Sequence, residues 1–184
     1  TALNSFGNLT WETGLPDWAG YHRVASPFDY PNLGQLEVVQ LGSDPKSDQF
    51  QADIEQWMRT QLDFGKSTLV LFSSRAQLEA TRDTFMRDWY EKLFYLTHVV
   101  IVKIPFAVPD DPIQAATSEW LESRGRNPFM DLTLPAASIR LVQACGRLIR
   151  KETDSGRISI LDRRLTSTRY GKLLLDSLPP LRRI

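Results

Sequence analysis

The stretch Thr68-Leu-Val-Leu-Phe72, followed by Ser73-Ser74, decides the fold class of this chain. It is a continuous apolar run of strand length, which is typical of a parallel strand covered on both faces. The two serines open a predicted helix that runs from Arg75 to Leu93. A second apolar run, Leu96 to Ile104, predicts another buried strand, which Pro105 ends. Strand, helix and strand in this order predict right-handed βαβ units on a parallel sheet.

The same alternation continues on both sides of these segments. Short strands are predicted at 36–41 and 157–161, helices at 44–62, 113–123 and 135–151, and a turn followed by a final helix within 165–178. Gly65 stands where a helix C-cap glycine is expected after the first of these helices. The pattern predicts a single α/β domain over residues 34–184, preceded by a loop-rich leading segment, residues 1–33, that is dense in Gly and Pro.

Composition limits the classes of partner and cofactor. The 184 residues carry 22 Lys and Arg against 22 Asp and Glu, so a nucleic-acid partner must be held by a local patch. The single cysteine, Cys145, excludes a disulfide framework or an iron–sulfur site built from this chain, and fits a reducing, cytosolic compartment. No apolar run approaches the length of a membrane-spanning helix, so no membrane partner is expected. The chain opens on Thr1 and not on Met, which is typical of a piece of a longer protein.

The predicted helix 135–151 carries the first group of candidate residues. At 100° per residue, Gln143, Arg147 and Arg150 fall on one stripe, and Gly146 leaves room beside it for a ligand. Guanidinium groups offer a planar fork of donors that suits phosphate oxygens. A solvated basic face explains the same spacing equally well. Cys145 is interpreted as a small core residue and not as a reactive thiol.

A second group lies just beyond the carboxyl ends of two predicted strands. Ser73, Ser74 and Arg75 offer hydroxyls and free backbone N–H groups to a phosphate, with plain helix capping as the alternative. Lys103 and Phe106 follow the next strand, where Phe106 either stacks on a DNA base or fills the core.

Other polar residues give weaker signals. His98, inside an apolar strand, is interpreted as a satisfied core histidine, and Asp110-Asp111 as loop caps and not as metal ligands. We find no set of metal ligands and no GxxxxGK[ST] phosphate loop, so the chain by itself is not a complete P-loop ATPase.

Several stretches, taken in order, resemble one family. They are Ser26–Tyr30, Leu69–Ser74, Val102–Phe106 with Pro109–Pro112, Arg124–Phe129, Gln143–Arg150 and Tyr170–Pro179. Together they resemble the C-terminal motor domain of DinG-type helicases, which are XPD-like members of helicase superfamily two. The resemblance covers nearly the whole chain.

The resemblance implies a RecA-like, three-layer fold and a role as the second motor domain of an ATP-dependent 5′→3′ DNA helicase in DNA repair or replication. Gln143 and Gly146 would contact the nucleotide, and Arg147 and Arg150 would act as arginine fingers. ATP and Mg would be shared with a first motor domain of the same protein, absent here, which would also hold a 4Fe–4S cluster. Ser73, Ser74, Arg75, Lys103 and Phe106 would lie near single-stranded DNA. A monomer in the bacterial cytoplasm, associated with the nucleoid, is implied.

Two departures from the family matter. The acidic, glycine-containing motif V should precede the strand at Leu96 and is absent. At the same place the predicted helix runs into the strand with no turn residue, although a helix needs a reversing loop before a parallel strand. Both observations predict a missing segment near residues 90–95.

Without the first motor domain, the 184 residues should neither hydrolyse ATP nor unwind DNA. The alternative is a non-catalytic α/β domain that docks a replication or repair protein.

Overall fold

The computed structural model describes residues 6–16, 18–85, 96–107 and 111–184. Its strands form one five-stranded sheet in the order β2-β3-β4-β1-β5, and every neighbouring pair is parallel. The strands are β1 (Gly34–Val38), β2 (Ser67–Leu71), β3 (Leu96–Ile101), β4 (Gly156–Ile160) and β5 (Arg182–Arg183). The predicted α/β class with a parallel sheet is therefore confirmed.

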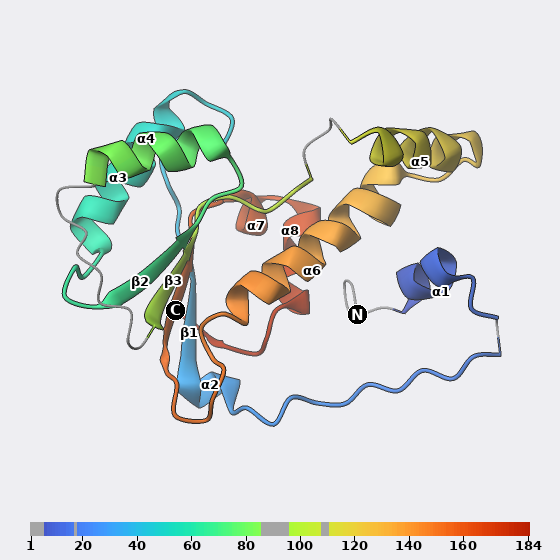
Figure 1. Ribbon diagram of the computed structural model, residues 1–184, viewed down its shortest axis with the longest axis horizontal. Coiled ribbons are helices and arrows are strands. Elements are labelled where there is room, and N and C mark those ends of the chain that lie inside the picture. Colours follow the sequence, from blue (N-terminus) through green and yellow to red (C-terminus); the bar gives the residue numbers. More distant parts are fainter. Residues whose placement is uncertain (1–5, 17, 86–95, 108–110) are drawn as a thin grey trace.

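Helices cover both faces of this sheet, which gives the three layers of a RecA-like fold (Figure 1). One face carries α3 (Gln49–Gln61) and α4 (Arg75–Phe85), and the other carries α6 (Leu134–Cys145) and α8 (Arg169–Ser177). Alternate residues of β3 and its continuation serve the two layers. Val99 and Ile101 pack in the cluster with α6, whereas Val100 and Val102 pack in the cluster with α3. Because both faces are buried, the strand reads as an unbroken apolar run.

The remaining elements lie around these layers. They are α1 (Gly7–Thr13), α2 (Tyr30–Leu33), α5 (Pro112–Ser123), the π-helix η2 (Phe129–Thr133) and α7 (Arg164–Ser167). In Figure 1, α5 projects beyond the sheet. After a short non-helical stretch, η2 begins at Phe129 and continues directly into α6, which begins at Leu134. The leading segment contains α1 and a long extended stretch, in agreement with its many glycines and prolines.

Several predicted boundaries need correction. The strand predicted at 36–41 spans Gly34–Val38, and the strand predicted to run to Ile104 ends at Ile101. The helix predicted to run to residue 151 ends at Cys145, and the helix predicted from residue 44 begins at Gln49. Gly65 is not a C-cap, because α3 is capped at Leu62, whose N–H bonds to the carbonyl of Met58. The predicted end of α4 at Leu93 and the expected gap near 90–95 lie outside the described residues. Among the residues described, no helix is long and apolar enough to cross a bilayer.

Candidate functional site

The first candidate group lies where α6 ends. Gln143 is on the last turn of the helix, and Gly146 is its C-cap, donating its N–H to Val142. The N–H groups of Arg147 and Leu148 then bond to carbonyls three residues back, at 3.2 Å each, which is a tighter winding than in an α-helix. The prediction of one helical stripe through Gln143, Arg147 and Arg150 is therefore wrong.

Asp154 holds the loop that follows the helix end. One of its carboxylate oxygens accepts the backbone N–H groups of Arg150 at 2.8 Å and of Lys151 at 2.9 Å. These two bonds hold the pKa of Asp154 below its usual value. The N–H groups that a longer helix would use are thus committed to the loop, and Gly146 has a poor helix propensity.

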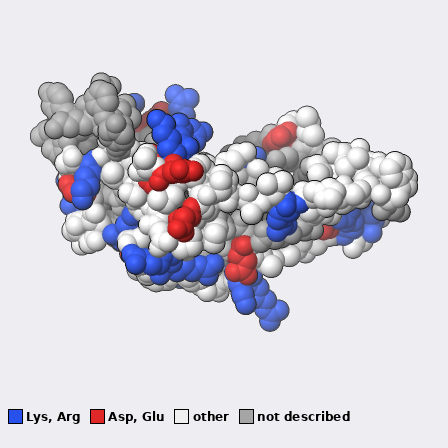
Figure 2. Space-filling view, turned by 90° about the horizontal axis from the view of Figure 1, so that it is seen from below, with Lys and Arg blue, Asp and Glu red and all other residues white. Residues whose placement is uncertain are grey.

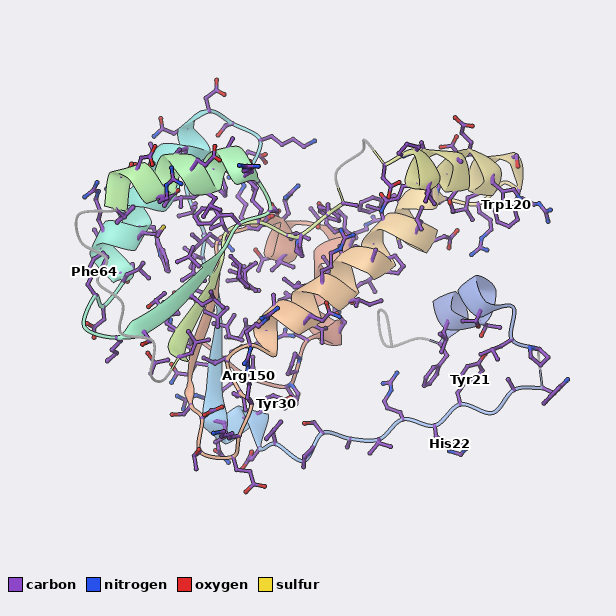
Figure 3. The ribbon with its side chains drawn as sticks, viewed as in Figure 1. Tyr21, His22, Tyr30, Phe64, Trp120 and Arg150 are labelled. Atoms are coloured by element: carbon purple, nitrogen blue, oxygen red, sulfur yellow. The ribbon has the colours of Figure 1, made fainter. Side chains whose placement is uncertain are left out.

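The arginines of this group remain accessible. Gln143, Gly146, Arg147 and Arg150 are all exposed. Within the part of the chain that the structure describes, neither guanidinium forms an ion pair, unlike those of Arg157 and Arg164. Figure 3 shows Arg150 just beyond the C-terminal end of α6. These side chains are thus available to a phosphate supplied from outside the described chain.

This group belongs to the amino edge of the sheet. A Cβ on Gly34, the first residue of β1, would lie 3.2 Å from the Cδ1 of Ile149. The chain then passes from Arg150 to Gly156, where β4 begins beside Gly34.

The second candidate group lies at the opposite, carboxyl edge. Ser74 Oγ accepts the N–H of Gln77 at 3.4 Å, so it caps α4, as the alternative interpretation predicted. Ser73 is exposed, and Arg75 is exposed but paired with Glu79 at 2.9 Å. A phosphate at this helix start would have to share Ser74 with the cap and draw Arg75 away from a carboxylate.

Lys103 and Phe106 are both engaged within the fold. The Lys103 ammonium lies 5.0 Å from the centroid of the Phe50 ring, and burial lowers its pKa, helped by the charge of Arg164. Phe106 is partly buried. The centroid of its ring lies 5.9 Å from that of Phe129 and 6.1 Å from that of Tyr170. The structure therefore shows Phe106 in the core role that the sequence left open.

The sequence did not lead us to Asp162, which is fully buried and lies two residues after the end of β4. Its Oδ1 accepts two hydrogen bonds from Arg164, one from the backbone N–H at 3.1 Å and one from the side-chain Nε at 2.8 Å. Its Oδ2 accepts one from Nη2 of Arg164 at 2.6 Å and one from the backbone N–H of Ile104 at 2.9 Å. The Asp162 carboxylate raises the pKa of Arg164. The available signal was an Asp followed by two arginines at the carboxyl end of a predicted strand.

A polar chain crosses the sheet on its α3 side. His98 Nε2 lies 2.9 Å from Ser159 Oγ, which donates to Glu37 at 3.1 Å, and Glu37 also accepts Arg157. Burial lowers the pKa of His98. The predicted satisfied histidine is thus confirmed. An open groove of about 500 Å³ lies beside it at the amino edge; residues of both charge signs line it, among them Asp63, Lys66, Arg157 and Arg182.

The donor set limits which cofactors this chain holds itself. Cys145 is buried, and burial raises the pKa of its thiol to about 12, so it is a core residue. Asp111 caps α5 through the N–H of Ile113 at 2.9 Å, whereas Asp110 is outside the described residues. No cluster of three His, Cys, Asp or Glu residues that could hold a metal ion occurs among those the structure describes. With one buried cysteine, these residues do not fit an iron–sulfur cluster. The exposed Gln143 and Arg147 carry amide and guanidinium donors of the kind that bind phosphate oxygens.

The surface charges match the neutral composition. Figure 2 shows Lys and Arg interspersed with Asp, Glu and uncharged residues on the face in view, without one continuous basic surface. Any anion site on this face is therefore local.

Comparisons with known proteins find relatives of this chain. Residues 92–181 match the family described as the helicase C-terminal domain. The chain is 34% identical over 229 aligned positions to the ATP-dependent DNA helicase DinG of Photobacterium profundum, covering 100% of this chain and 33% of that protein. It is 48% identical over 84 positions to the 3′-5′ exonuclease DinG of Bacillus subtilis, covering 46% of this chain and 9% of that protein.

Solved structures share the fold. An XPD structure from S. tokodaii superposes with a TM-score of 0.58 at 15% identity, covering 92% of this chain and 42% of that chain. The chain spans about a third of the length of the DinG helicases that it matches end to end. Over residues 92–181 the chain belongs to the helicase C-terminal domain family, and along its whole length it is similar to DinG helicases.

Proposed function

We propose that this chain is the second motor domain of an ATP-dependent 5′→3′ DNA helicase that acts in repair or replication. The observation that carries the proposal is the end-to-end similarity to a DinG helicase, at 34% identity. Single-stranded DNA and a first motor domain of the same protein are its partners, and a bacterial cytoplasmic monomer is the expected form.

Arg147 and Arg150 are proposed as arginine fingers on ATP that the first motor domain binds. Both guanidiniums are exposed, and in the described part of the chain neither has a carboxylate partner to give up. They would stabilise the charge on the γ-phosphoryl group during hydrolysis. Gln143 and the open side of Gly146, which only its own helix approaches within 4 Å, would contact the same nucleotide. Mg and the 4Fe–4S cluster are assigned to the absent domain.

The test uses the full-length protein. Arg147→Ala should lower DNA-stimulated ATP turnover by about 10³-fold, the scale of an arginine finger, while the melting temperature stays near that of the wild type. Arg82→Ala is the matched control, because Arg82 is an exposed α4 arginine that pairs with its neighbour Asp83. Unchanged turnover in Arg147→Ala would favour the docking domain instead. Robust ATPase activity of the 184 residues alone would contradict the proposal.

We also propose that a segment containing motif V is missing near residues 90–95. The DinG alignment has 229 positions and includes the whole of this 184-residue chain, so at least 45 positions have no counterpart here. Trypsin cleaves after Lys92 and Lys103, so a peptide spanning 93–103 reports on the junction. Its detection in a digest of the natural protein would establish a true deletion. Its absence, with longer peptides in its place, would show that residues are omitted from the sequence.

A further inference from the structure

Three aromatic side chains form a cluster that joins separate parts of the fold. Phe106 follows β3, Phe129 begins η2, and Tyr170 lies in the first turn of α8. Their ring centroids are 5.9 Å apart for Phe106 and Phe129, 6.1 Å for Phe106 and Tyr170, and 5.2 Å for Phe129 and Tyr170. Each ring therefore contacts both others, and we call this set the aromatic joint.

The buried ion pair fixes one side of the joint. Arg164, held by both oxygens of Asp162, has its guanidinium carbon 5.5 Å from the centroid of the Phe106 ring. Asp162 also accepts the backbone N–H of Ile104 at 2.9 Å. The loop after β3 is thus tied down at its backbone through Ile104 and at its side chain through Phe106. Displacement of this loop would have to move the aromatic joint with it.

The other side of the joint is the start of a rigid helix. Phe129 is the first residue of η2, and its carbonyl accepts the N–H of Leu134, where α6 begins. π-Helical turns are rare and often mark functional positions. Four fully buried or nearly buried residues, Leu134, Ala137, Leu141 and Cys145, anchor α6 to the sheet along its length. A shift at Phe129 would therefore be carried along α6 to Gln143 and Gly146.

We propose that Phe106 is a positioning residue: through Phe129 it couples the loop at the carboxyl edge to the end of α6 that presents Gln143 and Arg147. This inference rests on the proposed function, because it takes single-stranded DNA as the ligand of the carboxyl edge. DNA that binds at Ser73, Ser74 or Lys103 would press on the loop after β3. The joint would pass that displacement to the nucleotide-facing end of α6.

The test measures amide hydrogen exchange in the full-length protein, with and without a saturating oligothymidylate whose binding is followed by fluorescence anisotropy. In the wild type, DNA should change the amide exchange rates of residues 143–150 by about fivefold. This is the lower end of the range of effects that one site has on another in coupled proteins. Phe106→Leu should keep DNA affinity and lose that response. Phe28→Leu is the matched control, since Phe28 is a partly buried ring that packs on the same core beside α2. It should keep the response.

Each outcome bears on the proposal. A full response in Phe106→Leu, or none in wild-type protein that binds DNA, would overturn it. Failure of the wild type to bind DNA would instead overturn the proposed function. If Phe106→Leu does not fold, Phe129→Leu, at a residue that is 36% exposed, replaces it with the same expected loss.

Discussion

Asp162→Asn provides the sharpest test of the packing at the carboxyl edge. Each oxygen of Asp162 accepts two N–H donors, with distances between 2.6 and 3.1 Å. In asparagine, one oxygen becomes an NH₂ group, which would face two donors in either orientation. The Arg164 side chain, only 18% exposed, would also lose its counter-charge.

The cost follows from the burial of the pair. Breaking a buried ion pair by removing one partner destabilises a protein by about 3–5 kcal/mol. Domains of this kind have a total stability of about 5–15 kcal/mol, so the loss is a large fraction of it. For a chain of this length, the melting temperature should fall by about 6–20 °C.

Thermal and urea unfolding followed by circular dichroism would measure this loss. Asp176→Asn is the matched control, because Asp176 is 53% exposed and pairs with Arg183 at 3.7 Å, and such surface pairs contribute about 0–1 kcal/mol. An Asp162→Asn variant within about 1 kcal/mol of the wild type would refute the buried pair described here.

Three further predictions concern stability and reactivity. Gly171→Ala should cost about 1–3 kcal/mol in urea unfolding, because its Cβ would meet the carbonyl oxygens of Arg164 and Leu165, whereas Gly20→Ala, with nothing within 4 Å, should cost far less. Burial holds the pKa of His98 below its ordinary value of 6.5, so the folded state binds fewer protons than the unfolded state. The stability due to neutral His98 is complete above about pH 6.5 and is lost as the pH falls through the folded pKa; His98→Gln should flatten this slope in urea titrations over that range. Cys145, whose pKa is raised to about 12, should react with iodoacetamide at about pH 8 only after denaturation, and rapid labelling of the folded chain would contradict its burial.

Local sequence signals predicted the sheet well because its central strands, β3 and β4, are largely buried, and the outer strand β2 is still partly buried along its whole length. The run around Thr68–Phe72 and the run ending at Ile104 need no information beyond their own apolarity. The end of α6 was not predictable in this way. Its helical pattern continues through Leu148 and Ile149, although the α-helix ends at Cys145. The structure shows the change through the tighter bonds of Arg147 and Leu148 and through the N–H groups of Arg150 and Lys151, which donate to Asp154.

The candidate site shows the same limit. The types of residue at Gln143, Arg147 and Arg150 were informative, and their exposure agrees with a phosphate ligand from outside the described chain. The prediction that they share one helical face was wrong, because α6 ends at Cys145, before the two arginines. The roles of Phe106 and Lys103 depended on partners more than 20 residues away in sequence, Tyr170 and Phe50, which no local pattern identifies.

The positions of the two candidate groups at opposite edges of the sheet limit how a motor domain of this kind would work. The strands separate the two groups, so a signal between them needs an element that runs from one edge to the other. The 12-residue helix α6 does so, over about 18 Å, from the aromatic joint to Gln143. Because its inner face is buried between the sheet and α8, α6 is expected to move as a rigid body and not to bend. Arginines at the end of such a helix would be placed by the packing at its start, so substitutions in the aromatic joint should change how DNA affects the nucleotide site without touching the nucleotide.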